Sequence, residues 1–149
     1  MKNNCSYPKA MAVISGGDVS SINGKVQFFQ KEKGTLVVAY ICGLPQIKDG
    51  SGFFAFHIHE GNSCAGENFA DTKGHFNPEN EPHPMHKGDL PPLISCNGSA
   101  YLAVLTDRFN ICDIIGKTVV IHDSFDDFHS QPSGNAGKKI ACGVIKKYF

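Results

Sequence analysis

The stretch "SGFFAFHIHEGNSC", residues 51–64, decides the fold, because its apolar and polar side chains alternate as they do along a β-strand. Successive side chains of a strand point to opposite faces of the sheet. His57 and His59 therefore share one face, with Cα atoms about 6–7 Å apart, near enough to bind one ion beneath a covering loop. The opposite, core-facing side carries Phe54, Phe56 and Ile58.

Short strands separated by turn residues run through the whole chain, and no stretch of a dozen residues shows a clear helical period. Two connections have the form of tight hairpins, "KEKGT" at 31–35 and Asn97-Gly98, a pair that favours a type I′ turn. Eight strands predict an all-β fold, an antiparallel sandwich or flattened barrel. They cover residues 10–15, 25–31, 35–42, 53–60, 92–96, 99–106, 117–122 and 140–146.

The length of 149 residues predicts one domain, 1–149, with residues 1–9 as a flexible N-terminal extension. Two long stretches, 60–91 and 123–139, lie outside the predicted strands. Loops of this length in a compact domain are usually functional or disordered. Their histidines, aspartates and lysines favour function.

Charge and hydropathy exclude several classes of partner. Fourteen basic residues balance fourteen acidic ones, so no overall positive field is available for a nucleic acid or an anionic membrane. The longest apolar run, "LVVAYICGL" at 36–44, is less than half the length that a bilayer requires. The N-terminus does not have the pattern of a secretory signal. We therefore expect a cytoplasmic protein, with secretion after removal of a leader as the alternative.

Six cysteines are scattered along the chain in no zinc-finger pattern, and six would allow fifteen full pairings. Their neighbours predict that Cys42 and Cys112 are small core residues. The other four are Cys5, Cys64, Cys96 and Cys142.

Histidines at strand ends form a first candidate metal site. His122 ends the strand "KTVVIH", and three imidazoles that converge from His57, His59 and His122 would suit copper or zinc. The alternative for each is a histidine that is solvated or only hydrogen-bonded. The order of residues does not show that the two strands are neighbours.

The segment "HFNPENEPHPMHKGD", residues 75–89, forms a second candidate site. Its prolines and Gly88 make a continuous helix improbable and favour a loop wrapped around an ion. Three histidines and one aspartate complete a tetrahedral zinc shell, which is typical of a structural site. The alternative is a polar loop that happens to contain histidine, and His129, outside both groups, is expected to be exposed. The four ligands would be His75, His83, His86 and Asp89.

Together these motifs resemble the Cu/Zn superoxide dismutases over residues 10–146. The resemblance depends on "FHIHE", "GHFNP", "HKGDLPP", "IIGKTVVIH", "DD" at 126–127 and "GNAGKKIACGVI". It implies an eight-stranded Greek-key β-barrel with two long functional loops, an architecture of which this family is a known example.

The resemblance also implies the roles of individual residues. His75 would be shared by both metals, Asp126 would link a copper histidine to a zinc histidine, and Cys64 would form a disulfide with Cys142. Lys139 stands where the family usually has the arginine that guides the anion, and it keeps the charge but loses the planar fork. The implied copper ligands are His57, His59, His75 and His122, and the implied zinc ligands are His75, His83, His86 and Asp89.

The implied reaction is dismutation of superoxide to dioxygen and hydrogen peroxide by alternate reduction and reoxidation of copper, with His75 delivering a proton. The segment between His83 and His86 is shorter than in the eukaryotic enzymes and resembles some bacterial members. A homodimer and a copper-delivery protein are candidate partners. The alternatives are a dismutase-like protein that binds copper without turnover and a cupin-type metalloenzyme, which would leave His83, His86 and Asp89 without a role.

Overall fold

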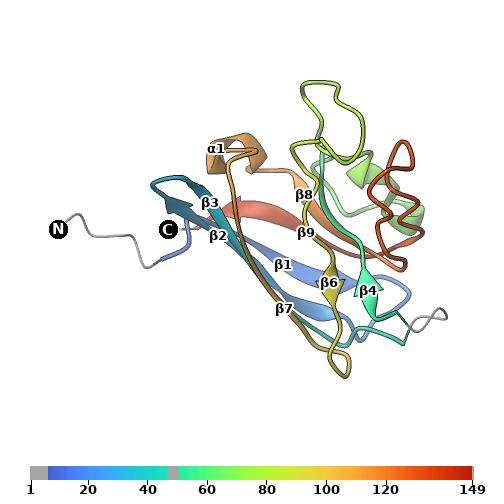
Figure 1. Ribbon diagram of the computed structural model, residues 1–149. Coiled ribbons are helices and arrows are strands. Elements are labelled where there is room, and N and C mark those ends of the chain that lie inside the picture. Colours follow the sequence, from blue (N-terminus) through green and yellow to red (C-terminus); the bar gives the residue numbers. More distant parts are fainter. Residues whose placement is uncertain (1–6, 47–50, 149) are drawn as a thin grey trace.

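The computed structural model describes residues 7–46 and 51–148 and is built almost entirely from antiparallel strands (Figure 1). These described residues include two short helical segments, the 3-10 helix η1 (Glu67–Thr72) and the helix α1 (Ile111–Ile114). No helix among the described residues has the length and apolar character needed to cross a bilayer. The strands are β1 (Ala10–Gly16), β2 (Asn23–Lys31), β3 (Gly34–Cys42), β4 (Phe53–Phe54), β5 (Phe56–His59), β6 (Leu93–Ile94), β7 (Ala100–Thr106), β8 (Thr118–His122) and β9 (Lys139–Lys147).

Seven strands form one curled sheet in the order β5-β8-β9-β1-β2-β3-β7, and β4 pairs with β6 in a second, two-stranded sheet. β4 leads directly into β5, and β6 leads into β7 through a tight hairpin. The short ladder therefore connects the two edges of the large sheet and closes a flattened barrel. The pairing of β3 with β7, which are not consecutive, is the crossover expected of a Greek key.

All eight predicted strands are present, and the predicted strand 53–60 is divided at Ala55 into β4 and β5. The N–H of Ala55 leaves the ladder and donates to Ser124 O at 2.8 Å. At the β6–β7 hairpin, Asn97 and Gly98 have φ of 50° and 82°, which confirms the predicted type I′ turn.

The barrel core consists of the inward-facing residues of each strand. Phe54, Phe56 and Ile58 are fully buried in this core, as the alternation of the opening stretch predicts. At the N-terminus, residues 1–6 of the predicted extension lie outside the described residues. Pro8 is buried, and Lys9 N–H donates to Phe28 O at 2.8 Å, so the chain already packs on the barrel there.

The prediction that Cys112 is a core residue is wrong, because its side chain is exposed. It lies on α1, whose buried residues are Ile111 and Ile114. Helix positions three apart share a face, so Cys112 is turned to the opposite side. Cys42 is half-buried at the end of β3 rather than fully enclosed.

Candidate metal centre

Six histidines converge where the two long loops lie side by side against the barrel (Figure 1). β5 and β8 are antiparallel neighbours, with His57 opposite Val120 and His59 opposite Thr118. Residues opposite one another in a sheet point to the same face, so His122, two residues after Val120, joins the two β5 histidines. The structure thus supplies the strand adjacency that the order of residues could not show.

The loop after β5 folds back onto the free edge of that strand. Phe76 N–H donates to Ile58 O, and Ile58 N–H donates to Gly88 O, both at 2.8 Å. A side chain at Gly88 would overlap the Ile58 carbonyl, so the loop can approach this closely only with glycine there. These contacts place His75 beside His59 and Asp89 beside His57.

Two groups of ligand atoms result, and in each group the atoms lie within 4.8 Å of one another. His75 belongs to both groups. All members are buried. The first cluster consists of His57, His59, His75 and His122, and the second cluster consists of His75, His83, His86 and Asp89.

Hydrogen bonds determine which nitrogen of each first-cluster histidine remains free. His59 Nδ1–H donates to Lys73 O at 2.8 Å and His122 Nδ1–H donates to Gly137 O at 3.2 Å, while their Nε2 atoms face each other at 3.2 Å. In His57 the roles are reversed, because Nε2 is bonded to Asp126 and Nδ1 is buried without a partner. Each of these three imidazoles therefore presents one lone pair to a common point.

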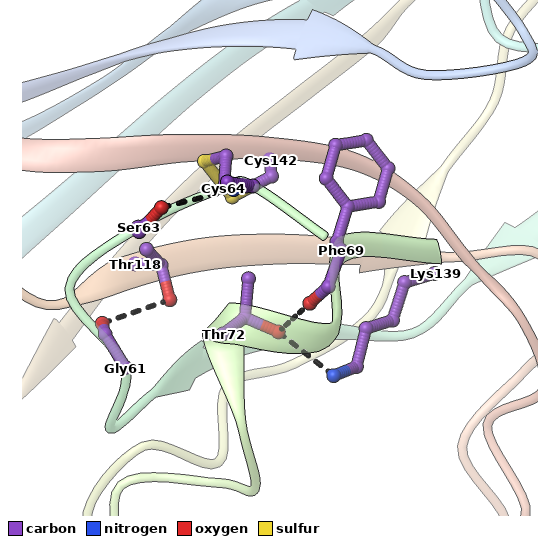
Figure 2. Close-up of a disulfide and its surroundings, with 9 residues drawn as sticks. Gly61, Ser63, Cys64, Phe69, Thr72, Thr118, Lys139 and Cys142 are labelled. Carbon is purple, nitrogen blue, oxygen red and sulfur yellow. Dashed lines mark hydrogen bonds between the residues drawn. A yellow bond between two sulfur atoms is a disulfide. The ribbon is translucent and has the colours of Figure 1, made fainter. Parts of the chain in front are cut away.

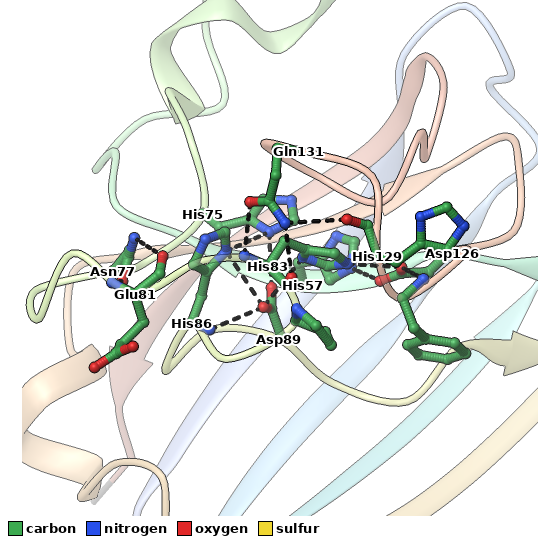
Figure 3. Close-up of polar contacts among 12 residues, drawn as sticks. His57, His75, Asn77, Glu81, His83, His86, Asp89, Asp126, His129 and Gln131 are labelled. Carbon is green, nitrogen blue, oxygen red and sulfur yellow. Dashed lines mark hydrogen bonds and ion pairs between the residues drawn. The ribbon is translucent and has the colours of Figure 1, made fainter.

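His75 presents its two nitrogens to different clusters. Its Nδ1 lies 2.7 Å from Asp89 Oδ1 and 3.2 Å from His86 Nδ1, whereas its Nε2 is buried without a hydrogen bond (Figure 3). His83 Nδ1 also makes no hydrogen bond, although Asp89 Oδ2 lies 3.1 Å away. Buried polar atoms normally have partners. Three orphaned nitrogens aimed at two common points fit bound metal ions.

Asp126 connects the two clusters, as predicted. Its Oδ2 accepts a hydrogen bond from His57 Nε2 and its Oδ1 accepts one from His83 Nε2, both at 2.7 Å (Figure 3). Burial by itself would raise the pKa of Asp126, but the hydrogen bonds from the two histidines outweigh it and lower that pKa to about 2. The carboxylate therefore stays ionised and holds both rings in one tautomer.

Gly134 covers this bridge. Its φ is 71°, and a Cβ atom there would overlap Asp126 Oδ1 and crowd His83 Nε2. Both the backbone conformation and the lack of space require glycine at this position.

Burial favours the neutral imidazole in His57, His59 and His122. It lowers the pKa of His57 to about 4 and that of His122 to about 3, and it lowers the pKa of His59 well below the ordinary value. A metal needs the neutral ring, since a proton on the free nitrogen would block the lone pair.

Lys139 lies next to the first cluster. Its Nζ donates to Thr72 Oγ1 at 2.7 Å (Figure 2). It also donates to Lys73 O at 3.0 Å. The same Lys73 carbonyl accepts the hydrogen bond from His59. Burial lowers the pKa of Lys139. Lys138 differs, because its ammonium pairs with Asp18 at 2.9 Å and is exposed.

Cys64 and Cys142 form the predicted disulfide, with Cα atoms 5.8 Å apart and a sequence separation of 78 positions. The bond attaches the segment before η1 to β9, beside Thr72 and Lys139 (Figure 2). His129 lies outside both clusters with a side chain that is 82% exposed, as expected.

Several residues that hold the clusters and Lys139 in place were not predicted from the sequence. Thr72, Gly134 and Gln131 act through contacts with segments distant in the chain. None has a local spacing that indicates its partner. The short motifs around the histidines therefore predicted the members of both clusters but not the residues that hold them in place.

The family model for copper/zinc superoxide dismutase (SODC) matches residues 22–145. The chain belongs to this family. Family membership accounts for both clusters and excludes the cupin alternative. Members of the family use copper and zinc, and the two clusters offer the donor atoms that such ions need.

Several relatives in the family are similar over most of this chain. Superoxide dismutase (Cu-Zn) 2 of Aquifex aeolicus is 35% identical over 138 residues, 83% of this chain and 78% of that protein. Superoxide dismutase (Cu-Zn) of Legionella pneumophila is 34% identical over 131 residues, 83% of this chain and 77% of that protein.

Relatives of a second kind are described only as dismutase-like. The superoxide dismutase-like protein YojM of Bacillus subtilis is 36% identical over 105 residues, 60% of this chain and 54% of that protein. A crystal structure of a SOD-like protein from Bacillus subtilis, a double mutant in which a tyrosine and a proline are each replaced by histidine, superposes with a TM-score of 0.76. It is 28% identical, with 90% of this chain and 95% of that chain covered.

Proposed function

We propose that this protein is a superoxide dismutase that converts two superoxide anions and two protons to dioxygen and hydrogen peroxide. The observation that carries the proposal is the position of His75, which presents Nε2 to the first cluster and Nδ1 to the second. One imidazole shared in this way couples a redox site to a structural site.

The donor sets support copper at the first cluster and zinc at the second. Four imidazoles suit copper, whereas three imidazoles and a carboxylate complete a closed tetrahedral zinc shell. When bound, copper supplies the one-electron redox chemistry and zinc a fixed positive charge. The proposed copper ligands are His57, His59, His75 and His122, and the proposed zinc ligands are His75, His83, His86 and Asp89.

The remaining chemistry belongs to the chain itself. Lys139 holds a positive charge beside the first cluster, and two of its three N–H groups are occupied by Thr72 and Lys73, so one is left for the incoming anion. His75 Nε2 is the proposed proton carrier, because Nδ1 is held by Asp89 and only Nε2 lacks a partner. A proton at Nε2 can pass to the reduced substrate.

The experiment is reconstitution with copper and zinc, followed by metal analysis and measurement of superoxide decay. We expect one copper and one zinc per chain and rapid decay. A chain that holds both metals but leaves the decay at the uncatalysed rate would overturn the dismutase proposal. Substitution His122→Ala should abolish copper retention and activity, and full activity in this variant would overturn the ligand assignment.

A second candidate function is copper binding without turnover, which the similarity to the dismutase-like relatives favours. Both candidates predict copper at the first cluster. Only the dismutase predicts that the rate of superoxide decay depends on Lys139.

A further inference from the structure

The backbone of His83 is bound by a side chain from the other long loop. Gln131 Oε1 accepts the N–H of His83 at 2.9 Å, and Gln131 Nε2 donates to the carbonyl of His83 at 2.8 Å (Figure 3). These two residues are 48 positions apart in sequence. One carboxamide thus satisfies both backbone groups of a single residue, in the manner of a strand partner.

The composition of this segment explains why an external partner is needed. Pro82 and Pro84 flank His83, and proline has no backbone N–H. The N–H of His83 is therefore the single backbone donor of residues 82–84, and Gln131 takes it. Only two residues separate His83 from His86, so the segment is too short to build a ladder of its own.

The next residues of the segment are held from a third part of the chain. Arg108 is the chain's one arginine, and its Nη1 donates to Pro84 O at 2.8 Å and to His86 O at 3.1 Å. The N–H of His86 donates to Asp89 Oδ2 at 3.0 Å. Side chains thus bind the N–H groups of both histidines and the carbonyls of His83, Pro84 and His86.

The loop that carries Gln131 also holds the ring of His83, through a different residue. Asp126, five residues before Gln131 in the same loop, accepts the hydrogen bond from His83 Nε2 at 2.7 Å. With its backbone and Nε2 both held, the fully buried ring of His83 can present only Nδ1 to the second cluster.

We propose that Gln131 is a positioning residue for the zinc ligand His83. Its contact between the two loops takes the place of the support that a longer segment would give. The inference rests on the zinc assignment made under the proposed function. Its consequence is that zinc retention depends on residue 131, which contacts no metal ligand atom.

The test compares Gln131→Met with Gln30→Met in the copper- and zinc-loaded protein. Methionine keeps the size of glutamine and removes both hydrogen bonds. Gln30 is a matched control, an exposed glutamine whose Nε2 donates to the carbonyls of Lys31 at 3.1 Å and Gly34 at 3.2 Å, on a distant hairpin. Zinc release to a chromogenic chelator should accelerate roughly 10- to 100-fold in Gln131→Met, the usual effect of losing an outer support of a metal ligand, and stay unchanged in Gln30→Met.

Two further measurements separate positioning from a general loss of structure. The visible spectrum of cobalt bound in place of zinc should change in Gln131→Met, while the thermal unfolding of the metal-free protein should not. Gln131→Glu, which keeps the acceptor for His83 N–H but loses the donor, should release zinc at an intermediate rate. If wild-type protein holds zinc and Gln131→Met holds it equally well, the inference is wrong and the zinc assignment stands. If wild-type protein holds no zinc at the second cluster, both are wrong.

Discussion

At the residue scale, Lys139 stands where the family resemblance implies an arginine. A guanidinium positions an oxyanion with a planar fork, whereas an ammonium is a compact charge on a flexible stem. Here two acceptors, Thr72 Oγ1 and Lys73 O, restrict that stem. The contact that aims the charge therefore comes from the η1 segment rather than from the side chain's own geometry.

The first prediction concerns this charge. Substitution Lys139→Met should lower the rate of superoxide decay about tenfold at low ionic strength and weaken its salt dependence, because steering, of which superoxide dismutase is itself a standard example, raises encounter rates by about 10- to 1,000-fold. Lys138→Met is the control, since Lys138 is exposed and paired with Asp18. Equal losses in the two variants would show that position 139 has no special role.

At the scale of elements, the disulfide joins a long loop to a barrel strand. Cys64 lies between β5 and η1, and Cys142 lies in the middle of β9, so the bond holds the η1 segment against the barrel. Thr72, which binds Lys139, belongs to the same segment. One covalent link therefore holds the segment that positions the Lys139 charge.

The second prediction is that Cys142→Ser lowers the free energy of unfolding by about 2–5 kcal/mol, since closing a loop of this length restricts the unfolded chain. Denaturant unfolding of the metal-free protein measures the change. Cys112→Ser is the control, because Cys112 is exposed and makes no disulfide. A midpoint for Cys142→Ser equal to that of the control would contradict the expected contribution.

At the scale of the whole molecule, metal binding and folding are coupled through buried histidines. His57 and His122 have pKa values of about 4 and about 3 in the folded chain, below the ordinary value of 6.5. Between each of these folded-state pKa values and the ordinary value of 6.5, the unfolded chain binds more protons than the folded chain does. The contribution of these neutral rings to the free energy of unfolding is therefore complete above pH 6.5 and is lost as the pH falls toward 3.

The third prediction follows for the metal-free protein. Its free energy of unfolding should fall on the order of a few kcal/mol between pH 7 and pH 4, because each unit of pKa difference corresponds to about 1.4 kcal/mol. Urea unfolding across this range measures the slope. His122→Gln should flatten the slope, and a wild-type midpoint that does not change with pH would contradict the prediction.

Local patterns predicted much of this molecule because a strand has a period of two residues. Alternation placed Phe54, Phe56 and Ile58 in the core and turned His57 and His59 to the other face, and the Asn97-Gly98 pair located a hairpin. The same reasoning misplaced Cys112, because a four-residue helix is too short to show its period in the sequence.

By itself, the sequence determined the eight strands, the histidines and aspartate of the candidate metal site and the two long loops, since residue type and spacing are local properties. Tertiary structure alone decided which nitrogen of each histidine is free, and that Thr72, Gln131 and Gly134 support Lys139, His83 and Asp126. These pairings join segments between 8 and 67 residues apart. They depend on how the loops pack on the barrel, and no spacing along the chain encodes that contact.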